Sequence, residues 1–479
     1  MRASSAEEAS GRAGARLWRR EWPAAILALV ALFVAFQFHL RSVIIPDMDE
    51  GTYVYAGQLI ARGLVPYRDF MLAHPPLIAV LVGGWSRLVG PDLMPVRIAY
   101  ILVILTTTLP LYALVRHETS SPRAALLTLV TYLTGMLLVA NMGRTVRLEP
   151  LMNAFVIGAV TFRFLRPSSH LSMMAMGGLF ACGLLVKLVA VVPAAMLLLA
   201  DILWARPWPS ASRRWFVAAA GASLVLVPAY LLWMRQPHFV QDVIFGQVNR
   251  PRLGLALRLR YFGQNIVRYP PILLGLVAAG FNLVRSRSRS IRAISLVALG
   301  STAILLFAFK TFFNYYIVQA LPWIATCFAV ALDAVGVRLL GRWWHWLPYA
   351  IAGVLGVLVP LAYAEAYDRK GAYHVAGPRA IVQLLRGGDG YLYSMYPGFA
   401  LWSGRTLYPW YNEVDSLVPR ITGSIGDQDF CTVFAGSGAL VLFSGELDDY
   451  PRAKAYMEAH FVREYQDADW SLWKRSLVP

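Results

Sequence analysis

Apolar runs of about twenty residues recur along most of this chain, and they constrain its fold more than any other feature. An α-helix needs roughly 20 apolar residues to cross the hydrocarbon core of a bilayer. Hydropathy places about eleven such runs. They are 23–45, 94–117, 121–141, 149–166, 170–187, 188–204, 214–234, 269–284, 291–309, 312–336 and 346–367. Charged residues make up 15% of the chain, against about a quarter in soluble domains. The sequence therefore predicts an α-helical polytopic membrane protein with about eleven spanning helices.

The pattern divides the chain into three parts. Residues 1–22 are polar and basic, and the apolar run that follows is too long for a cleaved signal peptide, so we expect a retained first helix. Residues 23–367 form the predicted membrane domain. Residues 368–479 change character, with short strands expected near 390–395, 439–443 and 470–475 and helices near 378–385 and 450–460. A small C-terminal α/β domain is the prediction for this last part.

Basic residues indicate the orientation in the membrane. Lys and Arg gather on the cytoplasmic side of membrane proteins. The stretch 76–90 is too short to span, so we expect an interfacial helix there. With that helix lying flat, the main basic connections fall on one side; they are Arg12 to Arg20, Arg116, Arg166, Arg206 to Arg214, Arg285 to Arg289 and Arg338 to Arg342. The outer loops 46–75 and 235–268 and the C-terminal domain are then extracytoplasmic, in a multi-pass protein of the inner or plasma membrane.

The charge balance excludes one class of partner. The net charge is +17, and residues 1–367 hold 33 Lys and Arg against 14 Asp and Glu. These cations are scattered between apolar runs, so membrane lipids are the expected partners and nucleic acid is not. The cysteines Cys182, Cys327 and Cys431 are too far apart to predict a metal site or a disulfide framework.

Charged residues of both signs collect near the predicted outer face. Lys187 and Lys310 each lie among apolar neighbours, where a charge is a functional candidate by default, although snorkelling of the lysine stem toward lipid headgroups is the plain alternative. The outer-face set is Asp47, Asp49, Glu50, Asp69, Arg144, Arg147, Glu149, Lys187 and Lys310. A carboxylate can take a proton from an acceptor, while cations hold a phosphate and stabilise the charge that grows as it departs. This combination suits an enzyme that acts on a lipid-linked phosphate.

Several motifs resemble those of one enzyme family. The first outer loop carries DEGTY at 49–53, GLVPYRD at 63–69 and HPPL at 74–77. RTVRLEP at 144–150, GLLVK at 183–187 and KTFFNYY at 310–316 with Gln319, Leu321 and Pro322 follow. Together they resemble the GT-C membrane glycosyltransferases, in the protein-mannosyltransferase-like branch that includes aminoarabinose lipid A transferases. The resemblance spans roughly residues 20–370.

The resemblance implies a reaction and its site residues. It implies an inverting transfer of a sugar from a polyprenyl-phosphate donor to a glycolipid, polysaccharide or protein on the extracytoplasmic face. Asp49 becomes the catalytic carboxylate, with Glu50 sharing the acidic work. Glu149 stands where the family often has a second acidic residue; it assists the acceptor, holds a cation, or pairs with Arg144 or Arg147. The implied contacts to phosphate or sugar are Lys187, Lys310, Arg144, Arg147, His74, Arg258, Arg260, Tyr315 and Tyr316.

One residue departs from the aminoarabinose branch. Those enzymes commonly have Lys before Pro-Pro-Leu, where this chain has His74, so a permanent positive charge is absent there. His74 is expected to form structural hydrogen bonds, while a divalent cation held by Asp49, Glu149 and His74 is an alternative.

The sequence leaves two other classes of function as alternatives. A transporter or lipid flippase usually binds its substrate near the membrane midplane between broken helices. In this sequence the charges gather near one face and the centres of the apolar runs carry almost none. A scaffold that binds envelope components is the third class, and it would not require Asp49, Lys187 and Lys310 together.

Overall fold

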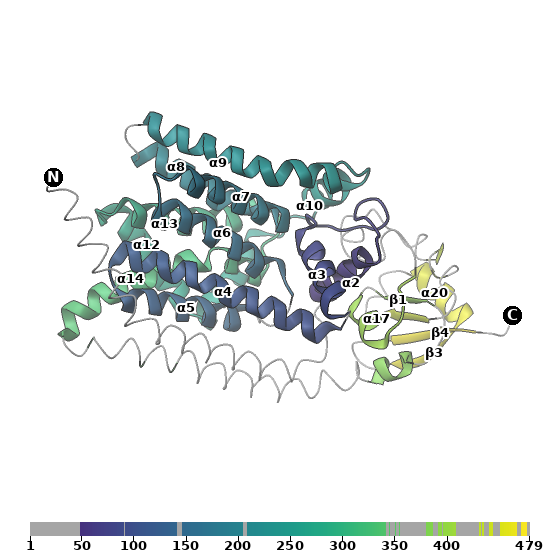
Figure 1. Ribbon diagram of the computed structural model, residues 1–479. Helices are drawn as coiled ribbons and strands as arrows, with labels where there is room; N and C mark the ends of the chain where they lie inside the picture. Colours follow the sequence, from purple (N-terminus) through teal and green to yellow (C-terminus); the bar gives the residue numbers. More distant parts are fainter. Residues whose placement is uncertain are drawn as a thin grey trace.

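We describe the protein from a computed structural model of the full chain. The residues described are 48–90, 92–140, 146–204, 208–341, 344, 350, 354, 380–386, 391–394, 396–408, 431, 432, 434, 440–443, 451–466 and 471–476. A bundle of helices forms one part of the molecule, and a small sheet lies at one end of it, beyond a pair of short helices (Figure 1).

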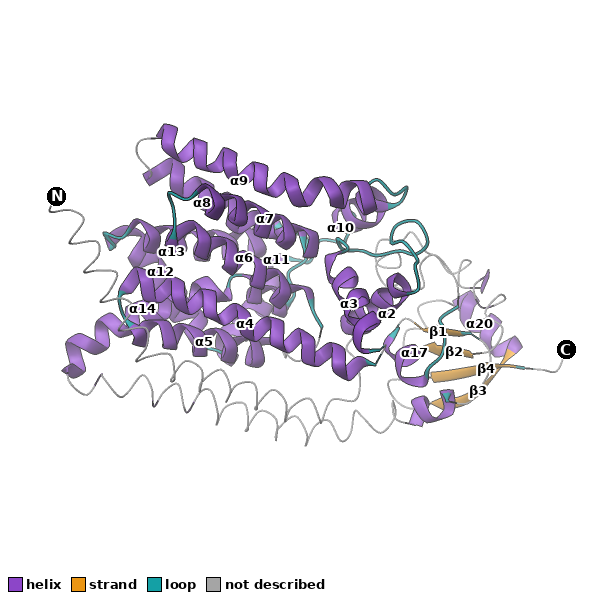
Figure 2. Ribbon diagram, viewed as in Figure 1, coloured by secondary structure: helices purple, strands orange, loops and turns teal. Residues whose placement is uncertain are grey.

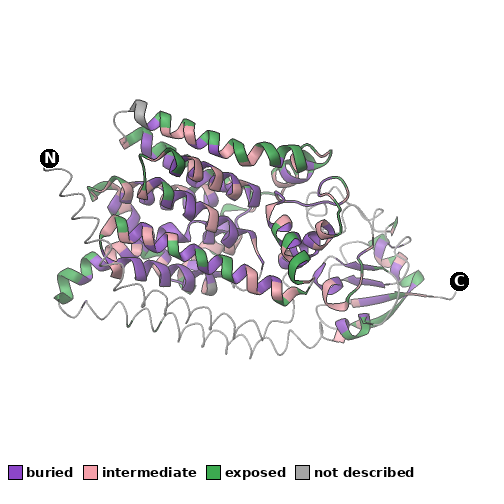
Figure 3. Ribbon diagram, viewed as in Figure 1, coloured by how far each residue is buried: buried purple, intermediate pink, exposed green. Residues whose placement is uncertain are grey.

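Long apolar helices make up the bundle (Figure 2). They are α4 (Leu93–Thr119), α5 (Pro122–Ala140), α6 (Leu148–Leu165), α7 (His170–Val186), α8 (Val191–Trp204), α9 (Trp208–Ala229), α12 (Pro271–Arg285), α13 (Arg289–Ala303) and α14 (Leu321–Leu340). Short irregular turns interrupt or join them: η1 (Leu188–Ala190), η2 (Tyr230–Met234), η3 (Val240–Phe245), η4 (Ile304–Ala308) and η5 (Asn314–Gln319). The helices bury apolar faces against one another, and α9 keeps mostly exposed residues at one edge (Figure 3).

The chain is a multi-pass membrane protein, and its described residues contain fewer helices of spanning length than the sequence predicts. Within the described residues, five helical segments are long and apolar enough to cross a membrane, and six if a bent pair counts as one. The five are Leu93–Thr119, Leu148–Leu165, Ala211–Met234, Arg289–Ala308 and Leu321–Leu340. The predicted runs 170–187 and 188–204 are helical but shorter than a span. The run 23–45 and nearly all of 346–367 lie outside the described residues.

Shorter helices occupy the two predicted outer loops. The stretch expected to lie at the interface forms α3 (Leu77–Val89), a helix of 13 residues that packs on α2 (Met48–Ala61). The 235–268 connection contains α10 (Gly246–Val248) and α11 (Leu255–Arg268), and the chain turns by 101° between α11 and α12. Helix α11 therefore runs nearly perpendicular to α12, as expected of a helix that lies along the membrane surface.

Close backbone contact joins α7 and α9. A Cβ placed on Gly177 would lie 1.8 Å from the carbonyl oxygen of Ala218, and one on Gly221 would lie 2.1 Å from that of Met174. Small residues at these positions let two membrane helices approach closely, which is a common source of helix association in lipid.

The C-terminal part forms a mixed four-stranded sheet of order β1-β2-β4-β3. Strands β1 (Leu392–Ser394), β2 (Leu440–Phe443) and β4 (Ser471–Arg475) lie where strands are predicted. The sequence reading missed β3 (Phe461–Gln466), which continues directly from helix α20 (Pro451–His460) and pairs antiparallel with β4. It also missed the short helix α17 (Gly398–Ser403).

Helix α17 attaches this sheet to the membrane part through α2. A Cβ on Gly51 would lie 2.6 Å from the backbone nitrogen of Gly398, so the two helices touch at their backbones. The amide of Leu407 donates a hydrogen bond of 3.0 Å to the hydroxyl of Tyr55, which is almost fully buried. The C-terminal sheet is therefore packed beside the helix that carries the first acidic motif.

Candidate functional site

Asp49 and Arg147 meet although 98 residues separate them. Asp49 lies in the first turn of α2, and its carboxylate accepts a hydrogen bond of 3.0 Å from Arg147 Nη1. Arg147 is the N-cap residue of α6. The Asp49 side chain keeps 39% of its surface exposed, whereas that of Arg147 keeps 12%. The pair thus presents an accessible carboxylate whose ionised form is stabilised by a cation.

Glu50 has a different environment from its neighbour. It is fully buried, and Arg97 of α4 binds both of its carboxylate oxygens. One of these oxygens also accepts the backbone amide of Val146 at 3.1 Å. Glu50 therefore ties α2 to α4 and to the residue just before α6, and its charge is satisfied inside the protein.

A second buried ion pair joins Glu149 and Lys187. Glu149 lies in the first turn of α6, and Lys187 is the C-cap residue of α7. The Lys187 ammonium contacts a Glu149 carboxylate oxygen and lies over the ring of Tyr316, 4.3 Å from its centroid. The sequence alternatives paired Glu149 with Arg144 or Arg147; the partner is Lys187, because Arg147 points toward Asp49. Arg144 lies outside the described residues.

Tyr315 connects the two ion pairs. Arg147 lies over its ring, 5.0 Å from the centroid. Burial raises the pKa of Tyr315 well above its ordinary value, and the negative charges of Asp49 and Glu149 add to this effect. Its phenol therefore keeps its proton and can donate a hydrogen bond at physiological pH. Tyr315, Tyr316 and Phe313 pack ring against ring in η5.

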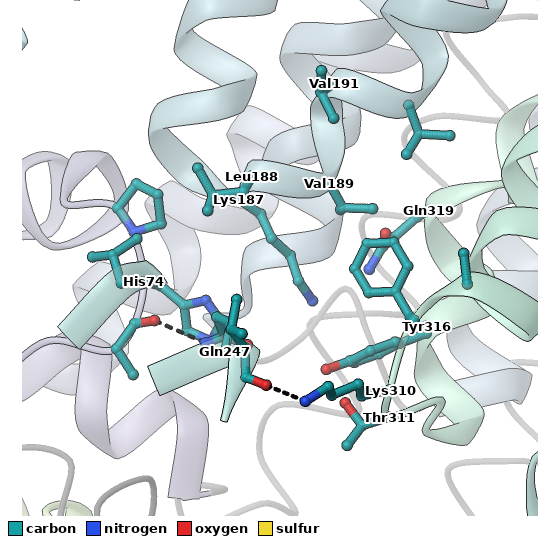
Figure 4. Close-up of a pocket in the computed structure, with 17 residues that line it drawn as sticks. His74, Lys187, Leu188, Val189, Val191, Gln247, Lys310, Thr311, Tyr316 and Gln319 are labelled. Carbon is teal, nitrogen blue, oxygen red and sulfur yellow. Dashed lines mark hydrogen bonds between the residues drawn. The ribbon is translucent and has the colours of Figure 1, made fainter. Parts of the chain in front are cut away.

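A cavity of about 420 Å³ opens beside Lys187 (Figure 4). Apolar side chains of η1, α8 and the turns near 243–248 and 308–309 make most of its wall. Its polar lining residues are His74, Lys187, Gln247, Lys310, Thr311, Tyr316 and Gln319. The Lys310 ammonium donates to the carbonyl of Val248 at 2.5 Å and remains exposed. Cations and apolar walls in one cavity fit a ligand with an anionic head and a hydrocarbon tail.

His74 is held in place by its backbone. Its carbonyl oxygen accepts a hydrogen bond of 2.7 Å from the hydroxyl of Tyr67, a buried residue with a φ of 65°. Burial lowers the pKa of the His74 imidazole well below 6.5, and the charges of Lys187 and Arg250 lower it further. The imidazole is therefore neutral at pH 7, so it can donate or accept a hydrogen bond to a ligand but adds no charge.

His74 makes stability depend on pH in a predictable direction. In the unfolded chain it gains a proton below about pH 6.5, while in the folded protein its depressed pKa prevents this. Acidification from pH 7.5 to 5.5 should therefore lower the melting temperature of the parent more than that of His74→Gln. Thermal unfolding in detergent measures the melting temperature of both proteins as a function of pH. The pH-dependent difference between them should disappear above pH 7.5. Equal losses on acidification would contradict a neutral His74.

Two amides complete the cavity; Gln319 belongs to a motif that the sequence analysis singled out, whereas the sequence analysis missed Gln247. Gln319 is 5% exposed, and neither its Oε1 nor its Nε2 has a hydrogen-bond partner among the described residues. Buried polar atoms normally have partners, so this amide is available to a ligand. Gln247 donates to the carbonyl of Ala73 at 2.9 Å and lies beside His74 (Figure 4). The polar Gln319 within an apolar motif was the only sequence signal.

Two arginines of the 235–268 connection lie elsewhere. Arg258 is buried, and its Nη1 donates to the carbonyls of Leu306 and Phe309 at 2.8 and 3.1 Å. Arg258 thus supplies hydrogen bonds to backbone carbonyl groups at the end of η4. Arg260 is exposed, and neither residue lines the cavity.

Asp49, Glu149 and His74, the alternative ligands of a divalent cation, do not form a cluster in the structure. Within the described part of the chain, no three His, Cys, Asp or Glu side chains lie close enough to share a metal ion. Asp49 and Glu149 bind Arg147 and Lys187 instead. In the described arrangement the two carboxylates therefore have cationic side chains as partners.

One family model matches part of the chain. Residues 73–233 match the family described as dolichyl-phosphate-mannose-protein mannosyltransferase. The curated proteins searched contain no match to the chain.

Solved structures share the fold over nearly the whole chain. ArnT from Cupriavidus metallidurans bound to undecaprenyl phosphate is 15% identical, with a TM-score of 0.68, over 96% of this chain and 99% of that one. Its apo state gives 17% identity and a TM-score of 0.65, covering 96% and 98%. The Archaeoglobus fulgidus oligosaccharyltransferase tethered with an acceptor peptide is 11% identical, with a TM-score of 0.56, covering 96% and 74%. The chain shares its fold with these two membrane proteins, and the resemblance to GT-C membrane glycosyltransferases that its motifs indicate is confirmed as a resemblance.

Proposed function

We propose that this chain, with its GT-C fold and its match to the mannosyltransferase family, transfers a sugar from a polyprenyl-phosphate donor to an acceptor of the cell envelope. One observation carries the proposal. Lys187 lines the apolar cavity and at the same time binds Glu149 beside the Asp49–Arg147 pair. A lipid phosphate bound at Lys187 would therefore hold its sugar next to an accessible carboxylate.

The cavity supplies the two kinds of contact that such a donor needs. Apolar walls from Leu188, Val189 and Val243 accept the first isoprene units of the lipid. Lys187 and Lys310 are placed to bind the phosphate, which cations bind through charge-assisted hydrogen bonds. Undecaprenyl phosphate is bound in the similarly folded ArnT, and a dolichol-phosphate in the Archaeoglobus fulgidus AglB, which supports this class of donor.

The proposed reaction uses Asp49 as the base. An acceptor hydroxyl or amine gives its proton to the Asp49 carboxylate while its oxygen or nitrogen forms a bond to the anomeric carbon of the sugar. The bond between that carbon and the phosphate oxygen breaks, and the electron pair leaves with polyprenyl phosphate. Lys187 stabilises the charge that grows on the phosphate. Attack opposite the leaving group inverts the anomeric carbon.

The remaining residues have supporting roles in this proposal. Arg147, which pairs with Asp49 and lies over the Tyr315 ring, orients the base, and the Tyr315 phenol donates to a sugar oxygen. Gln319 is available to sugar or phosphate oxygens. We assign Glu50 to holding the start of α6, because Arg97 and Val146 occupy its carboxylate. Helix α17, which packs on α2 near Asp49, brings the C-terminal part close to the acceptor in this proposal.

The positive connections support an extracytoplasmic site. The loops 46–75 and 235–268 supply cavity residues, and basic clusters such as Arg285 to Arg289 lie at other connections. A reporter that is active only in the cytoplasm, fused after Arg289, should therefore be active, because arginines favour that side. A periplasmic reporter fused at the same position is the control and should be silent. The reverse result would place the site on the cytoplasmic face.

Release of polyprenyl phosphate tests the function directly. The purified full chain is incubated with a panel of polyprenyl-phosphate sugars in the presence of a membrane extract that supplies acceptors. We expect one donor to release polyprenyl phosphate with the parent and none with Asp49→Asn. A protein that binds none of the donors and releases nothing would contradict the transferase and favour the transport alternative.

A further inference from the structure

A second cavity, of about 220 Å³, lies at the other end of the helix bundle. The ends of α6 and α8 and the beginnings of α9 and α13 form it. Its lining residues are Arg163, Phe164, Pro167, Ala200, Asp201, Trp204, Arg214, Arg289, Ser290 and Ala293. Three arginines and one aspartate in so small a space make it strongly basic.

The Asp201 carboxylate already has hydrogen-bond partners within the protein. Arg163 Nη2 binds its two carboxylate oxygens at 2.6 and 2.8 Å, and Trp215 Nε1 donates to the second at 2.9 Å. Asp201 and Arg163 are 9% and 7% exposed, so this pair is part of the interior. One arginine charge is therefore balanced, and the charges of Arg214 and Arg289 are left over.

Arg214 has a buried donor that no group of the described residues uses. Its Nε is buried, and within the described residues no acceptor lies at hydrogen-bond distance from it. Its guanidinium is partly desolvated, and it lies near both the Arg163 guanidinium, which repels it, and the Asp201 carboxylate, which attracts it. A buried donor of a charged group is costly when it is unpaired. An anion in the cavity would satisfy this donor and reduce the repulsion.

The cavity is remote from the proposed sugar-transfer site. Glu149 and Arg163 are 14 residues apart on α6, which corresponds to about 21 Å along a helix. Asp201 lies equally far in sequence from Lys187, toward the end of α8. The Glu149–Lys187 pair therefore lies at one end of α6 and α8, and the Arg163–Asp201 pair lies at the other end. This places the basic cavity at the membrane face opposite the sugar-transfer site.

The surroundings favour a lipid as the source of the anion. Trp204 and Phe164 line the cavity, and Arg292 lies over the Trp204 ring at 5.0 Å. On the same helix turns, Phe162, Leu203 and Phe216 expose 43%, 52% and 77% of their surface. Large exposed apolar side chains on spanning helices face hydrocarbon. An amphiphile can thus place a phosphate against Arg214 while its acyl chains run along α8 and α9.

We propose that this cavity binds the phosphate of an anionic phospholipid headgroup in the leaflet opposite the sugar-transfer site. Arg214 and Arg289 contact the phosphate, and Arg163 remains paired with Asp201. The proposal does not depend on the transferase function, because the cavity shares no residue with the other site.

Titration of the detergent-solubilised full chain with dioctanoyl phosphatidylglycerol, followed by native mass spectrometry, tests the proposal. Arg214→Gln should lose one bound lipid or bind it about tenfold more weakly, because a hydrogen bond to a charged group is lost. Arg213→Gln is the matched control, since Arg213 is adjacent and exposed and does not line the cavity. Dioctanoylglycerol, which has the same acyl chains and no phosphate, should not bind at this site.

Inorganic phosphate separates the two sources of the anion. Phosphate that binds with the same dependence on Arg214, and displaces the lipid, would support the phosphate site and show that no acyl chain is needed. Should Arg214→Gln not give a monodisperse protein with the parent's melting temperature, Arg289→Gln is used with Arg287→Gln as its control. Equal losses in a variant and its control, or equal binding of dioctanoylglycerol, would overturn the proposal.

Discussion

Asp49→Asn is expected to lower the rate of sugar transfer by about 10²–10⁴-fold while donor binding stays close to that of the parent. The amide has nearly the same shape as the carboxylate and still offers an oxygen to Arg147, so the site should keep its geometry. It cannot accept a proton from the acceptor. Release of polyprenyl phosphate measures turnover, and equilibrium binding of the donor measures the unaffected step.

Asp92→Asn is the matched control for this variant. Asp92 is exposed just before α4, and its side chain makes no capping hydrogen bond. The same change of charge there should leave the rate within a factor of two or so of the parent. Asp49→Asn with a rate within tenfold of the parent would remove Asp49 from the role of base and direct attention to Glu149, the other carboxylate of the site.

Lys187→Met is expected to have the second large effect, on both stability and donor binding. The substitution leaves the Glu149 carboxylate, which is 3% exposed, without its cation. Breaking a buried pair in this way costs about 3–5 kcal/mol of the free energy of unfolding. It also removes a cation from the wall of the cavity. Thermal unfolding in detergent and donor binding are measured on the same preparation.

A double variant separates these two effects. Lys187→Met with Glu149→Gln removes both charges, so most of the lost stability should return because no buried charge is left unpaired. Donor binding should remain weak, because the phosphate still lacks its cation. A double variant that binds the donor as tightly as the parent would make Lys187 a structural residue only.

Local signals singled out Asp49, through the DEGTY motif, and Lys187, through its apolar neighbours. In the structure each of them forms an ion pair, Asp49 with Arg147 and Lys187 with Glu149. Their functional roles stay predictions. The lengths of the spanning helices were predicted less accurately. Runs 170–187 and 188–204 were counted as spans, yet a single apolar stretch cannot show that the chain breaks at Lys187 and continues through η1.

The partner of each charged side chain could not be predicted from local sequence patterns. Arg258 and Lys187 look equally available as phosphate contacts in the sequence. In the structure Arg258 binds the carbonyls at the end of η4, whereas Lys187 reaches the cavity. Nothing in the order of residues distinguishes a guanidinium that caps a helix end from an ammonium that faces a ligand.

The sequence by itself determined a helical membrane protein with an acidic motif just after its first apolar run, because hydropathy and charge act over a few turns of one segment. Only the tertiary structure decided the partners of the charges. Asp49 meets Arg147 across 98 residues, and Glu149 meets Lys187 across 38. Such partners are selected by how the helices pack, since a buried charge is stable only beside the opposite charge that the packing brings to it.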